Sequence, residues 1–224
     1  MYQNLLFDLD GTLTDPKEGI TKSFQYALQA FGVEEELNRL NRVIGPPLID
    51  SFRDFYGFSE EQAKAAVEKY RERFSKVGIF ENARYPGVIE MLRALKDKGR
   101  TVCLATSKPI VFARQILEAY DMAPYFDITV GSELDGRRNY KNEVIDEVLR
   151  QLKHPPLDTV LMIGDRKQDI LGAKQCGIAA LGVRFGYAEP GELETAGADY
   201  LVDTVAQLRE FLEHIPVIES HEHF

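Results

Sequence analysis

The sequence has few cysteines, no long apolar run and no excess of positive charge. Its two cysteines, Cys103 and Cys176, stand far apart, so neither a disulfide framework nor a zinc site is expected, and a reducing compartment is favoured. No apolar stretch approaches the ~18 residues of a membrane-spanning helix, so no membrane partner is expected. The first residues run into an apolar segment without a basic region or cleavage site, which predicts a cytoplasmic rather than a secreted protein.

Positive charge is scarce. The chain has 27 Lys and Arg against 36 Asp and Glu, a net charge of −9 and a pI of about 5.1. Such a surface repels nucleic-acid phosphates, so no nucleic-acid polymer is expected as a partner. An anionic small substrate would need a local positive centre, which a divalent cation held by acidic residues provides. The terminal His221 and His223 are expected to lie in a solvated end rather than in a metal site.

The segment from residue 15 to residue 80 reads as one helix after another. Apolar residues recur at helical spacing over 20–31, where Gly32 ends the run, and again over 48–55. Ser59 is placed to cap a further helix. The run 43–47, which contains Gly-Pro-Pro, interrupts the helices and predicts a rigid loop.

Beyond residue 80, short apolar strands alternate with helices. This alternation predicts a parallel sheet with helices on both faces. We therefore predict an α/β fold with a Rossmann-like parallel sheet and an inserted all-helical cap. The core comprises residues 1–14 and 81–224, and the cap comprises residues 15–80. The expected core strands cover residues 5–7, 101–105, 128–130, 160–163, 179–183 and 200–202, and the expected core helices cover 87–98, a segment opened by Pro109, 142–152, 169–176 and 205–212.

Two carboxylates follow the first strand, in the run Phe7-Asp8-Leu9-Asp10-Gly11-Thr12. Side chains alternate along a strand, so both acids share a face if the strand continues, and the glycine allows a sharp turn. The acids therefore come to the edge of the sheet where open α/β folds bind ligands. Because clustered carboxylates repel one another, such a pair indicates a cation or acid–base chemistry. The alternative is a turn with two solvated aspartates.

Thr106 and Ser107 follow the strand at 101–105. Hydroxyl and amide groups at such a turn suit a phosphate oxygen, and the alternative is a simple helix cap. Lys141 begins a helix, where a cation is normally disfavoured. It indicates an anionic partner nearby, and the alternative is an ordinary surface lysine.

Asp165 and Asp169 follow the strand at 160–163 in the run 164–169 (GDRKQD). They are either a second acid pair or a turn residue and a helix cap. Because carboxylates from two strand ends are the oxygen ligands that Mg²⁺ accepts, their coincidence with the first pair favours a magnesium site.

The order acid pair, hydroxyl, lysine, acid pair resembles the haloacid dehalogenase superfamily of phosphatases. The resemblance rests on the runs 8–12 (DLDGT), 105–107 (ATS) and 164–169 (GDRKQD) and on Lys141. It implies a Mg²⁺-dependent phosphomonoesterase acting on a small phosphorylated metabolite. The segment 15–80 is similar to the small helical cap that this family carries between its first and second motifs.

The resemblance also implies roles for these residues. Asp8 would attack phosphorus and form an aspartyl-phosphate. Asp10 would protonate the leaving oxygen, then activate water, and give its backbone carbonyl to the metal. Thr106 and Lys141 would hold phosphoryl oxygens, and Lys141 would also balance Asp8. Asp169 would be a direct ligand or would support the ligands. The expected metal-binding residues are Asp8, Asp10, Asp165 and Asp169.

Two substrate classes stay open. The runs 131–145 and 164–174 look like the 5′-nucleotidase-like subgroup, whereas the loop 43–48 and the run 106–109 (TSKP) look like phosphoglycolate phosphatases. A cap that closes over a phosphate presents a surface to the leaving group. The cap residues expected to bind the substrate are therefore Arg42, Gly45 and Pro47. Ser107, which follows the strand at 101–105, is expected to bind it from the core.

Other activities are less favoured. Dehalogenases of the superfamily lack an acid at the position of Asp10, and ion pumps carry a different signature and membrane helices. A sugar phosphomutase with the same core stays possible in principle, as does a non-hydrolytic phospho-acceptor or scaffold. Both a monomer and a homodimer are compatible with the sequence.

Overall fold

The computed structural model describes residues 2–214, so the terminal histidines lie outside the described residues. A six-stranded parallel sheet forms its centre, in the order β5-β4-β1-β6-β7-β8. The α/β prediction is thus confirmed. The strands are β1 (Asn4–Phe7), β4 (Thr101–Pro109), β5 (Ile128–Ser132), β6 (Val160–Gly164), β7 (Ala179–Val183) and β8 (Tyr200–Val202).

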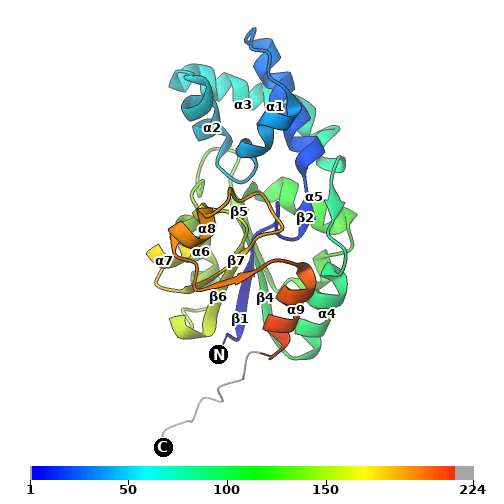
Figure 1. Cartoon of the computed structure of the whole chain (residues 1–224), viewed down its shortest axis with the longest axis vertical. Coiled ribbons are helices and arrows are strands. Elements are labelled where there is room, and N and C mark those ends of the chain that lie inside the picture. The colour runs from blue at the N-terminus through cyan, green and yellow to red at the C-terminus, as the bar shows by residue number, and fades with distance from the viewer. Residues whose placement is uncertain (1, 215–224) are drawn as a thin grey trace, which may run out of the picture.

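Helices cover both faces of the sheet (Figure 1). Successive side chains of β1 point to opposite faces, so Leu6 packs in one apolar cluster while Leu5 and Phe7 pack in the other. This double burial explains why the strands are apolar without interruption. The helices on the Leu6 face are α6 (Lys141–Gln151), α7 (Lys167–Gln175) and α8 (Glu192–Ala196), and those on the Phe7 face are α4 (Val88–Asp97), α5 (Ile110–Ala119) and α9 (Val205–His214).

The helical segment lies beyond one end of the sheet, where Figure 1 shows α1, α2 and α3 grouped together. Its centre is aromatic: the Phe24 ring stacks on Phe52 with centroids 4.1 Å apart. Ser59 caps α3 as expected, because its hydroxyl accepts from the backbone N–H of Gln62. The segment consists of α1 (Lys17–Ala30), the 3₁₀-helix η1 (Leu37–Val43), α2 (Leu48–Tyr56), α3 (Glu60–Phe74) and the 3₁₀-helix η2 (Gly78–Phe80).

Two short strands mark where the chain enters and leaves this segment. β2 (Thr14–Asp15) pairs antiparallel with β3 (Ala83–Arg84), a pairing that is too short to show periodicity in the sequence. We keep 15–80 as the proposed cap and call this segment the cap below.

Three other boundaries differ from expectation. β4 runs on to Pro109 through an irregularity after Ala105, and α5 starts only at Ile110. α7 starts at Lys167 rather than 169, so Asp169 is its third residue and not its cap. The helix α8 was missed, because a helix of five residues shows too little periodicity. Among residues 2–214, no helix has both the length and the apolar character to span a membrane.

Candidate active site

The candidate site lies at the carboxyl ends of the three adjacent strands β4, β1 and β6. Asp8 follows β1 directly, Thr106 lies in the irregular end of β4, and Asp165 follows β6. Because parallel strands end at the same edge of a sheet, residues far apart in the chain meet here. Gly11, with φ +79°, completes the turn after β1, and a Cβ atom there would overlap the Asp165 carboxylate.

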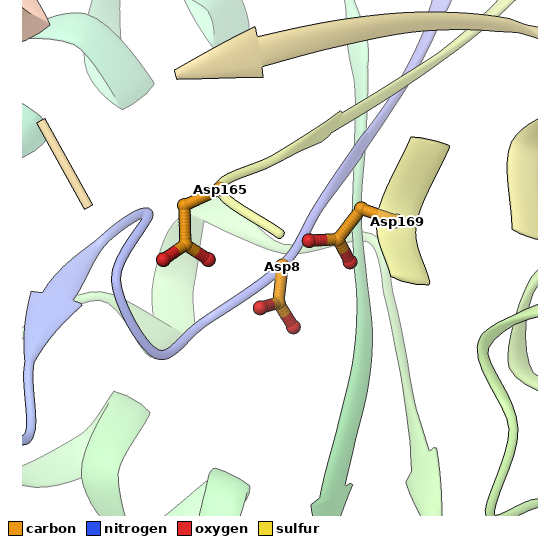
Figure 2. Close-up of side chains that lie close together, drawn as sticks. All are labelled: Asp8, Asp165 and Asp169. Carbon is orange, nitrogen blue, oxygen red and sulfur yellow. The ribbon is translucent and has the colours of Figure 1, made fainter. Parts of the chain in front are cut away.

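Three buried carboxylates form the base of the site. Asp8, Asp165 and Asp169 are each at most 5% exposed, and each offers an oxygen within 4.8 Å of the others (Figure 2). Asp165 Oδ2 accepts from the backbone N–H of Tyr187 at 2.7 Å, whereas its Oδ1 has no hydrogen-bond partner. A buried, unpartnered carboxylate oxygen among other carboxylates needs a cation. The donor set therefore fits a hard divalent ion such as Mg²⁺.

Lys141 supplies part of that positive charge. Its Nζ lies 2.8 Å from Asp8 Oδ1 and 2.7 Å from Asp169 Oδ1, and it donates to the carbonyl of Ala105 at 2.9 Å. It is 5% exposed, so the alternative of a surface lysine is excluded. One ammonium group against three ionised carboxylates leaves two negative charges, which a divalent cation would balance.

Asp10 stands apart from the three-carboxylate cluster. Its Oδ2 pairs with Lys108 Nζ at 2.8 Å, and the same ammonium lies 4.4 Å from the centroid of the Phe74 ring on α3. The backbone N–H of Lys108 also donates to Thr106 Oγ1 at 3.2 Å. Lys108 therefore connects the acid, the hydroxyl and the cap. No role was predicted for it, although a lysine two residues beyond a hydroxyl at a strand end was a usable signal.

A cavity opens above these groups, between the sheet and the cap. It continues into a second cavity between α2, α3 and the loop 132–139, and five residues line both: Pro47, Leu48, Arg71, Ser107 and Pro109. The side chains of the first cavity that come from the core include Asp8, Asp10, Thr106, Ser107 and Lys108, and those from the cap include Val43, Pro46, Tyr70, Arg71 and Phe74.

Of the three cap residues predicted to bind substrate, two line the first cavity and one does not. Gly45 and Pro47 line the first cavity. Arg42 does not: its guanidinium lies 3.7 Å from a Glu35 carboxylate oxygen and 4.6 Å from the centroid of the Phe55 ring. The structure therefore places Arg42 within the cap, beside Glu35 and Phe55, and not among the residues that line the first cavity. The cap cation that lines both cavities is Arg71, whose Nη1 donates to the carbonyl of Leu134 at 3.2 Å.

Burial raises the pKa of three carboxyl groups of the site, those of Asp10, Asp165 and Asp169. It raises the pKa of Asp169 to about 6, against the opposing effect of Lys141. It also raises the pKa of Asp165 well above its usual range, with Asp169 and Asp8 adding to the effect. The pKa of Asp10 is likewise raised by burial, and Lys108 limits the rise. Burial opposes the charged form of Lys141, but Asp169 and Asp8 outweigh it and raise the lysine pKa.

These shifts predict an unusual pH dependence of stability without metal. A carboxyl whose folded pKa is raised binds more protons folded than unfolded, so stability falls as pH rises from the unfolded to the folded pKa. For Asp169 that window runs from 3.8 to about 6. We expect the free energy of unfolding, measured by urea in EDTA, to fall by at least about 1.4 kcal/mol from pH 5 to pH 7.

The Asp165→Asn variant is the control, because it removes one charge of the cluster. Its slope over the same pH range should be visibly flatter than that of the natural chain. An equal slope in the two proteins would contradict the assignment of the pH dependence to this cluster.

The chain matches known proteins over most of its length. The family described as "Haloacid dehalogenase-like hydrolase" matches residues 5–183. A "5′-nucleotidase" of Pseudomonas aeruginosa is 46% identical over 95% of this chain and 96% of its own length. A "Tyrosine-protein kinase PtkA" of Mycobacterium tuberculosis is 33% identical over 94% and 72%, and a "Phosphoglycolate phosphatase" of Vibrio parahaemolyticus is 30% identical over 92% and 94%.

A solved structure is also similar to this chain over nearly its whole length. The crystal structure of a predicted phosphatase from Clostridium acetobutylicum superimposes with a TM-score of 0.92 and 45% identity, covering 95% of this chain and 98% of that one.

Proposed function

This chain belongs to the haloacid dehalogenase-like hydrolase family and is a phosphatase, and we propose that it hydrolyses small phosphomonoesters with Mg²⁺ through phosphorylated Asp8. The observation that carries the proposal is the buried cluster of Asp8, Asp165, Asp169 and Lys141 at the base of the cavity. Asp8, Asp165 and Asp169, with the Asp10 carbonyl, would hold the metal, which would neutralise phosphoryl charge when bound.

The first step uses the free oxygen of Asp8. Lys141 holds Asp8 Oδ1 at 2.8 Å, which leaves the other oxygen to attack phosphorus. A bond forms between Asp8 and phosphorus as the bond from phosphorus to the ester oxygen breaks, and Asp10 gives its proton to that oxygen. Water then attacks the aspartyl-phosphate, Asp10 takes the proton from the water, and Asp8 is released with inorganic phosphate.

Asp10 suits the acid role because its buried position favours the protonated form of its carboxyl group. Burial raises its pKa, whereas Lys108 lowers it. A carboxyl with an ordinary pKa near 3.9 would be a poor acid at neutral pH, so the rise that burial causes in the pKa of Asp10 favours the acid role. Thr106, Ser107 and Lys141 would hold the phosphoryl oxygens, since hydroxyl and ammonium groups stabilise the negative charge that is transferred.

The second cavity favours a leaving group larger than two carbons. Its α2–α3 side combines apolar residues with charged ones, namely Leu48, Ile49 and Val67 beside Lys64, Glu68 and Arg71. Its loop side carries the polar residues Ser132, Asp135 and Asn139. A nucleoside combines a planar base, whose two faces can pack on apolar side chains, with a ribose whose hydroxyls can bond polar groups, so it suits a cavity with both kinds of wall. We therefore propose a nucleoside 5′-monophosphate as the substrate class, in line with the 46% identical 5′-nucleotidase.

Phosphoglycolate is the alternative substrate. The cations Arg71 and Lys108 both line the first cavity, and either could pair with the carboxylate of a short phosphorylated acid. Among the relatives, the phosphoglycolate phosphatase is less similar than the 5′-nucleotidase.

Phosphate release tests the proposal. Inorganic phosphate is measured over a panel of nucleoside monophosphates, sugar phosphates and phosphoglycolate, with Mg²⁺ and with EDTA. The proposal expects Mg²⁺-dependent release, fastest for a nucleoside monophosphate. Transfer of phosphate between sugar carbons without net release would indicate a mutase, and a stable phosphorylated chain without turnover would indicate a phospho-acceptor.

Cap residues at the junction of the cavities should change substrate preference. In Pro47→Gly and in Arg71→Gln, we expect the ratio of kcat/KM between two substrates of the panel to change by about tenfold. The reason is that both residues line the two cavities through which the leaving group would extend. Arg42→Ala is the matched control and should leave the order unchanged. If every substrate falls by one common factor in Pro47→Gly and Arg71→Gln, the two residues do not discriminate.

A further inference from the structure

Arg166 is a buried cation beside the proposed metal ligands that the proposed mechanism leaves unused. It follows Asp165 directly, precedes α7 and is 6% exposed. Its Nε donates to Glu192 Oε1 at 2.9 Å, and its Nη1 donates to the backbone carbonyl of Ile44 in the cap. Arg166 is not among the residues that line the cavity above Asp8, so its geometry is not that of a substrate ligand.

Glu192 fixes this guanidinium from the core side. It is the first residue of α8, and its side chain is 9% exposed. Its carboxylate also accepts from the backbone N–H of Lys167 at 2.8 Å and of Glu189 at 3.1 Å. Because these partners all belong to the core, Arg166 stays paired and aimed at the cap whether or not Ile44 is in contact.

The cap loop that contains Ile44 rests on the stem of Arg166. Gly45 has φ +104°, and a Cβ atom there would lie 2.6 Å from Arg166 Cγ, closer than real Cβ contacts. Gly45 and Pro47 also line the cavity that holds Asp8. One short loop thus contacts Arg166 on one side and forms a cavity wall on the other.

We propose that Arg166 is a positioning residue that holds the loop 43–48 closed over Asp8, through its contact with Ile44. This inference rests on the proposed function, because it takes the cap to open for substrate and to close for the attack. A single hydrogen bond to a backbone carbonyl can break in each turnover. The guanidinium then stays paired with Glu192, and water replaces the Ile44 carbonyl as its other partner. Closure would place Gly45 and Pro47, which line the cavity, against the leaving group. It would also exclude water from the site while the ester bond breaks.

Kinetics of Arg166→Ala provide the first test, with Arg166→Lys as the conservative variant. We expect KM to rise and kcat/KM to fall by about 10- to 100-fold for the best substrate in Arg166→Ala, with partial recovery in Arg166→Lys. The inhibition constant of inorganic phosphate should change less than about threefold, because phosphate has no leaving group to align. A loss of phosphate affinity as large as the loss in kcat/KM would overturn the proposal and make Arg166 a phosphate ligand.

Two further variants keep the kinetic test interpretable. Arg166→Met/Glu192→Gln removes both charges of the buried pair and so avoids leaving one unpaired; it should show the same rise in KM. Arg184→Ala is the matched control, because Arg184 pairs with Glu194 on the surface. An unchanged KM in a folded double variant would overturn the proposal.

Amide hydrogen exchange tests the contact without any activity. Exchange in peptides covering 43–48 should be faster in Arg166→Met/Glu192→Gln, while peptides from β6 keep the exchange of the natural chain. Unchanged exchange in the loop, or faster exchange everywhere, would overturn a positioning role. If the natural chain released no phosphate from any ester, the proposed function would fail, and this measurement would still decide whether Arg166 holds the loop.

A double-mutant cycle tests the contact with Gly45. Gly45→Ala should lower kcat/KM strongly in the natural background and about tenfold less in the Arg166→Ala background. The strain of alanine at φ +104° is the same in both backgrounds and cancels, so only the contact with Arg166 remains. Additive losses would contradict the direct contact.

Discussion

Asp8→Asn is expected to abolish turnover, by about 10³-fold or more in kcat, while the fold stays intact. Asparagine is nearly the same size as aspartate but is a poor nucleophile and a poor Mg²⁺ ligand. The variant also loses the ion pair with Lys141 at 2.8 Å, which leaves the lysine paired with Asp169. The measurement is phosphate release under saturating substrate, with far-UV circular dichroism and a thermal melt to confirm folding.

Asp203→Asn is the matched control, because this carboxylate is exposed, pairs with Arg184 on the surface and lines neither cavity. It should retain full activity. If Asp8→Asn, in a preparation free of deamidated protein, kept about a tenth of the natural kcat, the assignment of Asp8 as nucleophile would be wrong. Trapping of phosphorylated protein by acid quench in the natural chain, and not in Asp8→Asn, would support it further.

Removal of divalent metal is expected to have the next largest effect. EDTA should lower activity by about 100-fold or more, because several kcal/mol of transition-state stabilisation depend on the cation. Millimolar Mg²⁺ should restore activity, and Ca²⁺ should substitute poorly, because it prefers more ligands at longer distances. Full activity in metal-free buffer would contradict the interpretation of Asp8, Asp165 and Asp169 as a metal site.

Thermal melts separate metal binding from catalysis. At a Mg²⁺ concentration of about 100 times Kd, the natural chain should gain about 2.7 kcal/mol, which corresponds to a rise in Tm of about 5 to 10 °C. Asp165→Asn should show a much smaller rise, since it removes the carboxylate whose Oδ1 has no other partner. A rise of equal size in both proteins would place the metal elsewhere.

Several features of this protein follow from local sequence. The apolar strands and the helical spacing predict a parallel sheet covered on both faces, because side-chain periodicity records burial directly. The positions of Asp8, Thr106 and Asp165 after three strands predict that they meet, because parallel strands end at one edge. The loop with Gly45 and Pro47 is visible as an interruption of helices.

The contacts that join the cap to the core could not be predicted in this way. Lys108 pairs with Asp10 beneath Phe74, Arg166 reaches Ile44, and Arg42 turns away to Glu35. Each choice depends on which charged or aromatic group lies nearest once the chain has folded. Local sequence patterns cannot predict such contacts, because the partners lie far apart in the chain. Arg166 and Ile44, for example, are separated by 122 residues.

The sequence by itself thus determined the parallel sheet, the helical character of most of the segment 15–80 and the placing of acidic and hydroxyl groups at strand ends, because these depend on periodicity and on where strands end. Only the tertiary structure decided that Lys141 is buried between Asp8 and Asp169, that Arg71 rather than Arg42 lines the cavities, and that Arg166 contacts the cap at Ile44. The physical reason is that burial and ion pairing act over a few ångströms in space, irrespective of distance along the chain.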